Sequence, residues 1–152
     1  MSYDLMVLDK RKRFKGKDDF LEWYDALIEW SEDIDYNDYR HATPNLQSWF
    51  LEMKAIVPPL NGEFAPSDDE LGNGRFQEAD YCIAKEAIYA AFAWSDAEEV
   101  HALVSDLARK NDLAFFDISA NHVIYPDGFV LDLDDKEKKP SFLKRLKSFL
   151  GL

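Results

Sequence analysis

The chain has 152 residues, 14% of them aromatic, and a formal net charge of −12 at pH 7. That length suits a single domain with one core, and the aromatic content excludes an acidic disordered chain. The only cysteine, Cys82, excludes an intramolecular disulfide and a zinc site made of several thiolates. No apolar run is long enough for a signal peptide or a membrane span, so we expect a cytoplasmic protein.

The first two elements that the sequence predicts are a strand and a helix. Residues 3–8 form a short, apolar-rich run that is followed by a charged turn, which is typical of a strand. From Asp18 the apolar residues recur at helical spacing, and we predict a helix start capped by Asp19 with Glu22 three residues on. The apolar stripe of this helix consists of Phe20, Trp23, Tyr24, Leu27 and Ile28.

A second helix and a long irregular segment follow. Thr43 can cap a helix and Pro44 suits its first position, and the stripe that begins at Leu46 continues until Pro58 ends the helix. Residues 60–79 then contain Gly, Pro, Asn and Asp without any periodic pattern. Loops of this length are uncommon in compact domains and are usually functional or mobile.

Residues 80–94 alternate between apolar and polar as two short strands would, although their alanines also suit a helix. We predict a hairpin that turns near Lys85 and Glu86. Ser95 and Glu98 form a capping box, and the apolar stripe after it predicts a third helix that closes near Asn111.

Strand-like runs complete the folded part of the chain. Residues 113–118 and 122–125 are separated by a short polar turn, and residues 129–133 are a candidate edge strand. The order β-α-α-β-β-α-β-β predicts an α+β domain over residues 1–135. It has an antiparallel sheet of four to five strands with about three helices packed on one face, as in ferredoxin-like sandwiches.

The tail, residues 136–152, is basic, unlike the acidic segment before it, and its pattern predicts a basic amphipathic C-terminal helix. Lys144, Arg145 and Lys147 lie opposite an apolar face. Such a helix can sit on anionic lipid, but the acidic domain would repel the same surface. Docking back onto the acidic body is therefore favoured over membrane contact.

No motif for catalysis or for a cofactor is visible. His41, His101 and His122 share no ligand-like spacing, and the acidic run 68–70 lacks the alternating oxygen ligands of a calcium loop. Cys82 is most simply a core residue, and the segment 72–74 lacks the lysine and hydroxyl of a phosphate loop. We therefore predict a protein that is not an enzyme and has no metal site and no cofactor.

Charge is distributed unevenly along the chain. Basic residues crowd residues 10–17 and 136–147, whereas residues 18–135 contain 27 of the 30 acidic residues and only six basic ones. A field of this sign attracts cationic surfaces and repels nucleic acid, because phosphate contacts dominate nucleic-acid affinity. The partner expected from charge is thus a protein with a basic groove.

The predicted partner-binding residues are the carboxylates on the outer face of the first helix, together with the acidic run of the long loop. The alternative for any one of them is an ordinary solvated position. They are Asp18, Asp19, Glu22, Asp25, Glu29, Glu32, Asp33, Asp68, Asp69 and Glu70.

Several segments also mark a family. The motifs are MSYDL at 1–5, TPNL at 43–46 followed by WFLEM at 49–53, PPLNG at 58–62, DYCI at 80–83, IYAAFAWSDAE at 88–98 and FFDIS at 115–119. In these motifs the chain resembles small bacterial proteins, uncharacterised or immunity-type, that occur beside polymorphic toxins of the contact-dependent-inhibition and Rhs classes. The resemblance covers roughly residues 1–128 and implies an inhibitor without catalytic residues. It transfers no toxin-contacting residue, since immunity proteins vary most at those positions.

From charge and resemblance together we expect an immunity protein that binds and neutralises one cognate toxin domain, with an acidic surface blocking a basic active-site cleft. The alternative is a regulatory or interaction module whose basic C-terminal helix docks a partner or a membrane surface. An enzyme acting on a small cationic substrate is the third reading. The oligomeric state stays open.

Overall fold

The computed structural model describes residues 2–134, so the amphipathic helix predicted within residues 136–152 lies outside the described residues. The described part contains six strands, three α-helices and one short 3-10 helix. In chain order they are β1 (Tyr3–Asp9), α1 (Lys17–Leu27), α2 (Pro44–Ile56), β2 (Asp80–Ile83), β3 (Ala87–Phe92), η1 (Trp94–Asp96), α3 (Ala97–Lys110), β4 (Leu113–Asp117), β5 (His122–Ile124) and β6 (Val130–Asp132).

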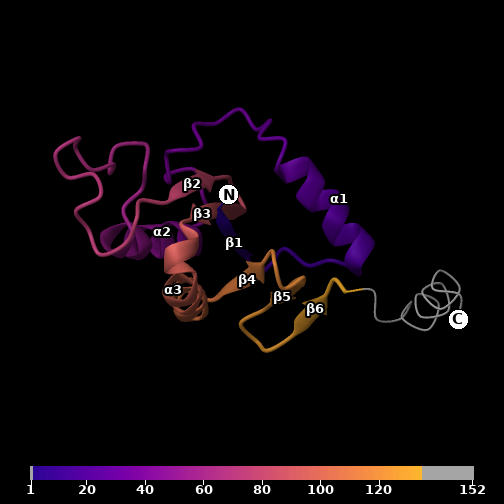
Figure 1. Ribbon diagram of the computed structural model, residues 1–152. Coiled ribbons are helices and arrows are strands. Elements are labelled where there is room, and N and C mark those ends of the chain that lie inside the picture. Colours follow the sequence, from indigo (N-terminus) through magenta and orange to yellow (C-terminus); the bar gives the residue numbers. More distant parts are fainter. Residues whose placement is uncertain (1, 135–152) are drawn as a thin grey trace, which may run out of the picture.

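The strands form one open sheet in the order β2-β3-β1-β4-β5-β6, and every neighbouring pair is antiparallel (Figure 1). The α+β class is thereby confirmed, but the sheet has six strands rather than four to five. The difference arises at the candidate edge strand, because Val130–Asp132 pairs with β5 and extends the sheet. The N-terminal strand β1 lies in the middle, between β3 and β4.

The helices do not share one face of the sheet, so that part of the prediction is wrong. One core cluster packs α2 and α3 against one face, and a second packs α1 against the other; Figure 1 shows α1 on the opposite side of the sheet from α2 and α3. The central strand explains this layering, since Leu5 and Val7 belong to the first cluster whereas Met6 and Leu8 belong to the second. A strand that is apolar on both faces needs a helix on each.

The larger cluster is centred on α2. Trp49 is fully buried, and its indole N–H donates to the carbonyl of Val104 in α3 over 3.4 Å. The phenol of Tyr81 in β2 donates to the carbonyl of Val57 at the end of α2 over 2.8 Å. These bonds satisfy polar groups that would otherwise be buried unpaired, so they fix α2 between the sheet and α3.

Neither predicted capping box forms. Gly16 is at the N-cap of α1, and the Asp19 carboxylate instead accepts a hydrogen bond from the backbone N–H of Lys15 over 2.8 Å. Asp96 rather than Ser95 precedes α3, and its carboxylate accepts from the backbone N–H of Gln77. The Asp19 carboxylate thus stabilises the segment that enters α1, whereas the Asp96 carboxylate ties the 60–79 loop to the start of α3.

The predicted hairpin and the predicted loop are both present. The β2–β3 turn is closed by the Ala84 N–H, which donates to the carbonyl of Ala87 over 2.9 Å. The ends of the 60–79 loop are held together where Leu60 donates to the carbonyl of Ala79 and Ala79 donates to that of Pro58. The long loop is thus anchored at its base.

Candidate partner-binding site

The outer face of α1 carries the acidic group that the sequence predicts. Asp18, Asp19, Glu22 and Asp25 are all exposed, whereas Phe20 on the inner side is fully buried. Within the described residues, Asp18, Glu22 and Asp25 have no ion-pair partner. Positions 18, 22 and 25 are four and three residues apart and lie on one side of the helix. The result is a row of exposed carboxylates along α1.

The remaining residues predicted for this helix face lie beyond the helix. The helix ends at Leu27 because the chain turns at Trp30, whose φ of 52° is in the left-handed region. Glu29 and Asp33 are exposed in the irregular segment that follows. Glu32 is half-buried, and its carboxylate accepts from the backbone N–H of Lys85 over 3.3 Å.

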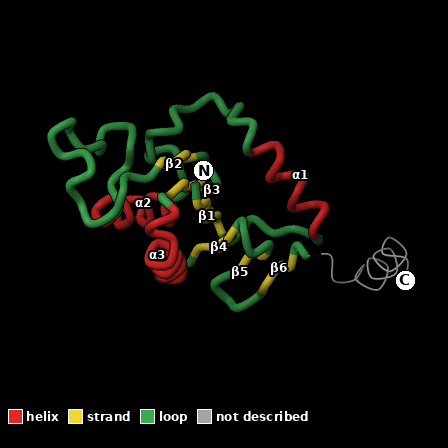
Figure 2. The backbone as a smooth tube through the Cα atoms, viewed as in Figure 1, coloured by secondary structure: helices red, strands yellow, loops and turns green. Residues whose placement is uncertain are grey.

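The acidic run of the long loop does not join this surface. Asp68, Asp69 and Glu70 are exposed in the 60–79 loop, which lies at the opposite side of the molecule from α1 (Figure 2). The Glu70 carboxylate accepts from the backbone N–H and the hydroxyl of Ser67, which lowers the pKa of Glu70. The ten predicted residues therefore form two separate acidic areas.

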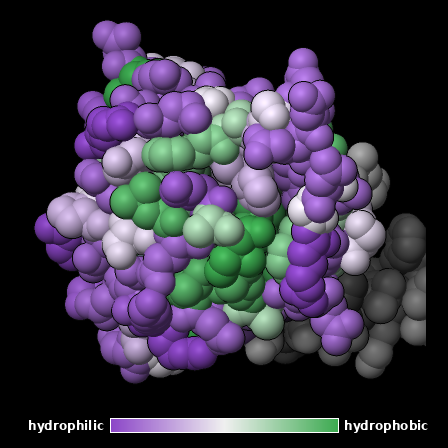
Figure 3. All heavy atoms as spheres, turned by 90° about the vertical axis from the view of Figure 1, so that its left-hand side faces the viewer, coloured by the Kyte–Doolittle hydropathy of each residue, from purple (hydrophilic) through white to green (hydrophobic). Residues whose placement is uncertain are grey.

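The side of the molecule that faces away from α1 is apolar at its centre. Figure 3 shows an apolar area there, surrounded by polar residues, on the side that α2 and the long loop occupy. Exposed Leu51, Ile56 and Leu60 come from α2 and the segment just after it. This apolar area therefore lies on the other side of the molecule from the acidic row on α1 (Figure 1, Figure 3).

The basic segment 10–13 is largely neutralised by ion pairs. Each of its four side chains contacts a carboxylate from a different part of the chain. The pairs are Lys10 with Asp112, Arg11 with Asp9, Lys12 with Glu86, and Arg13 with Asp127. The segment therefore holds β1 to neighbouring turns and adds little positive field to the α1 side.

The pair within this segment predicts a pH dependence. The Arg11 side chain and backbone N–H bind the buried carboxylate of Asp9, which lowers its pKa to about 2. A carboxyl whose pKa is lowered on folding stabilises the fold above its unfolded pKa of about 4, and that contribution is lost as the pH falls towards 2. Asp9→Asn should therefore lower the free energy of unfolding by about 2 kcal/mol at pH 7, and by less at pH 3.

Urea unfolding at the two pH values measures this difference. Asp127→Asn is the matched control, because Asp127 pairs with Arg13 in an exposed position and exposed ion pairs contribute little to stability. An Asp9→Asn difference that is the same at pH 3 and pH 7 would contradict the assignment.

A cavity of about 350 Å³ lies beside α1, over strands β2 and β3. Its described lining consists of Tyr24, Ile28, Trp30, Asp80, Cys82, Tyr89 and Ala91. Sequence reasoning missed this site, because its residues come from one helix, one turn and two strands. The only available signal was period-two alternation, which places Asp80 and Cys82 on the face of β2 opposite Tyr81 and Ile83.

The thiol in this cavity is expected to react slowly. Burial and the neighbouring Asp80 carboxylate raise the pKa of Cys82 to about 11, so little thiolate is present at pH 8. Asp80→Asn should lower that pKa and speed alkylation of Cys82 by iodoacetamide. Mass spectrometry of the modified chain gives the rate. An unchanged rate in Asp80→Asn, or an equal increase in the distant Asp68→Asn, would contradict the role of Asp80.

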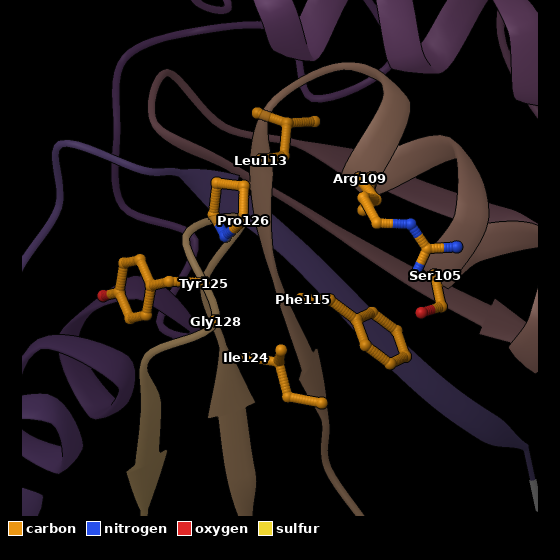
Figure 4. Close-up of a pocket in the computed structure, with 9 residues that line it drawn as sticks. Ser105, Arg109, Leu113, Phe115, Ile124, Tyr125, Pro126 and Gly128 are labelled. Atoms are coloured by element: carbon orange, nitrogen blue, oxygen red, sulfur yellow. The ribbon is translucent and has the colours of Figure 1, made fainter.

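A second cavity, of about 210 Å³, lies between α3 and strands β4 and β5 (Figure 4). Phe115, Ile124 and Pro126 make its lining mainly apolar. Arg109 reaches it from α3, but its guanidinium is paired with Asp106 at 2.6 Å. This arrangement offers a small apolar hollow without an unpaired charge from its described residues.

Among the described residues, one histidine lies beside a carboxylate. His101 Nε2 lies 3.3 Å from Asp117 Oδ2, and the other oxygen of Asp117 accepts from the backbone N–H and hydroxyl of Ser119. Burial and Asp117 raise the pKa of Tyr3 to about 12. His41 Nε2 lies 2.7 Å from the carbonyl of Ile83. In the described residues, no group of three His, Cys, Asp or Glu side chains could hold a metal ion.

Comparison with known proteins identifies no relative: no protein-family model matches the chain, and neither a curated protein nor a solved structure matches it. None of the helices within residues 2–134 is long and apolar enough to cross a membrane.

Proposed function

We propose that this protein is an immunity-type inhibitor that binds a cognate bacterial toxin domain and blocks a basic active-site cleft with carboxylates. The observation that carries the proposal is the row of exposed carboxylates on α1, formed by Asp18, Glu22 and Asp25, which have no ion-pair partner among residues 2–134. A toxin that cleaves or modifies nucleic acid needs a basic cleft for its substrate, and an acidic helix competes for that cleft. The family resemblance of residues 1–128 supports the same function.

Two observations favour the α1 side as the proposed binding surface. The carboxylates of 68–70 lie at the other side of the molecule, and Glu70 is engaged locally with Ser67. Glu32 is held by Lys85, so it contributes less than the exposed carboxylates of the helix. The proposal therefore assigns the contact to Asp18, Glu22 and Asp25.

The test begins with capture of the partner from the native strain and a growth assay with the recovered toxin domain. Rescue of growth is the criterion, and association rates are then measured at low and high salt. One variant combines Asp18→Asn, Glu22→Gln and Asp25→Asn. Its association rate constant with the toxin domain should be at least about tenfold lower than that of the unmodified protein at low salt, and the difference should shrink at high salt. The matched control is Asp68→Asn/Asp69→Asn/Glu70→Gln, which removes the same number of charges on the other side.

Equal slowing by the control, or full rescue by the α1 variant at an unchanged rate, would overturn the assignment to α1. Absence of any toxin domain whose activity the protein neutralises would overturn the proposed function itself.

A further inference from the structure

The cavity beside α1 has aromatic walls. Tyr24 comes from α1, Trp30 from the turn after it, and Tyr89 from β3. The rings of Trp30 and Tyr89 are 5.8 Å apart and nearly perpendicular, at 84°, so they form a corner. Trp30 is held in this position on its other side by Tyr36, at 5.3 Å. Aromatic faces arranged around a hollow attract cations through their quadrupoles.

Two carboxylates flank the floor of the cavity. Ala91 of β3 lies opposite Asp80 of β2 on one side and opposite Asp4 of β1 on the other. Residues paired across antiparallel strands share a face, so Asp4 and Asp80 project on the same side with a small alanine between them, about 10 Å apart.

The two carboxylates have different roles. Asp4 accepts hydrogen bonds from the hydroxyls of Tyr89 and Ser2, so it orients the Tyr89 ring. The carboxylate of Asp80 forms no hydrogen bond or ion pair with a described residue, and it lines the cavity. No basic side chain is among the described lining residues. A cation in the cavity would therefore meet an available carboxylate and no competing positive charge.

We infer that this cavity binds the guanidinium or ammonium group of an arginine or lysine side chain from the partner. Both groups sit on a long apolar stem, which suits a hollow of about 350 Å³ whose walls are Ile28 and aromatic rings. Anions are repelled by Asp80. A small hard metal ion would need several converging oxygen ligands, and only one carboxylate is among the described lining residues.

This inference rests on the proposed function only for the source of the cation. The acidic row on α1 would steer the basic surface of a partner, and the cavity next to it would receive one projecting side chain. Interfaces commonly concentrate their affinity in such an anchor inserted into a pocket.

The first test uses small probes and needs no partner. The full chain is titrated with N-acetylarginine methylamide and, separately, with its neutral isostere N-acetylcitrulline methylamide, by two-dimensional ¹H–¹⁵N NMR. We expect saturable shifts of the Trp30 indole N–H and of the Cys82 and Ala91 amides with the arginine probe alone. Asp80→Asn should weaken binding about tenfold, and Asp68→Asn should leave it unchanged.

Equal shifts with the citrulline probe would overturn the inference. So would arginine-induced shifts spread evenly over exposed carboxylates, or an unchanged affinity in Asp80→Asn. Trp30→Leu provides a second variant, which should abolish the probe shifts at Cys82 and Ala91 while the amide signals of α3 stay in place and show that the chain is folded.

The second test uses the toxin domain that the protein neutralises. Asp80→Asn should weaken that complex about tenfold although the α1 row is intact. Loss of probe binding with an unchanged toxin affinity would overturn the partner as the source of the cation. If no toxin domain is neutralised, the proposed function fails, and the probe titration still decides whether the cavity binds an arginine-like cation.

Discussion

Replacing Trp49 by alanine is expected to lower the free energy of unfolding by about 3–5 kcal/mol, since a large buried side chain is removed and its cavity does not fully collapse. Trp49 is fully buried between α2, α3 and the sheet. Its ring lies 6.3 Å from that of Tyr81, and its N–H donates to Val104. The variant loses both contacts. Urea unfolding followed by far-UV circular dichroism measures the change.

Two further variants calibrate this result. Ser48→Ala changes the exposed neighbour in the same helix and should shift the free energy of unfolding by less than about 0.5 kcal/mol. Trp49→Phe keeps an aromatic ring but removes the indole donor. Its loss of unfolding free energy should lie between those of Ser48→Ala and Trp49→Ala. A Trp49→Ala loss below about 1 kcal/mol would show that α2 does not form the centre of this core.

The helices and most strands could be predicted because their apolar spacing is regular. The stripe from Leu46 and the proline at position 58 place α2 within a few residues, and the alternation after Asp80 gives the hairpin. The layering could have been predicted as well, but was not. Residues 5–8 are four consecutive apolar residues, and an uninterrupted run indicates burial on both faces, whereas a sheet with helices on one face alternates.

The capping predictions failed because the folded chain supplies other hydrogen-bond donors at both helix starts. Asp19 lies at the start of α1, but its carboxylate accepts from the backbone N–H of Lys15. At α3 the N-cap is Asp96 and not the predicted Ser95, and the Asp96 carboxylate accepts from the backbone N–H of Gln77 in the 60–79 loop. A motif fixes which donors are near in sequence and does not fix the path of the preceding chain. The choice between these donors is made by tertiary structure.

Of the candidate site, the acidic row could be predicted from the sequence and the cavity could not. The exposed acidic row on α1 follows from helical spacing, because Asp18, Glu22 and Asp25 are local in sequence. The cavity cannot be seen at that level, since Tyr24, Asp80 and Tyr89 meet only after the sheet has formed. The end of α1 was also missed, because the outer face of the helix was predicted to continue to Asp33, whereas the helix ends at Leu27 and the chain turns at Trp30.

Replacing Phe20 by alanine is expected to lower the free energy of unfolding by about 3–5 kcal/mol and to release α1 before the rest of the domain. Phe20 is the only fully buried residue of this helix, and its ring lies 5.0 Å from those of Phe14 and Phe116. Because α1 lies on the other face of the sheet from α2 and α3, its position depends on this cluster. Hydrogen–deuterium exchange should show amides of α1 exchanging faster than those of α2.

Ala26→Ser, at an exposed position of the same helix, is the control and should leave the exchange of α1 slow. Equal acceleration in α1 and α2 would contradict separate docking and show that the two core clusters unfold as one. Because α1 carries the acidic row and the Tyr24 wall of the cavity, its release should weaken neutralisation and arginine-probe binding together. Phe20 faces inward and cannot touch a partner, so such a loss would measure how far both proposals depend on the position of α1.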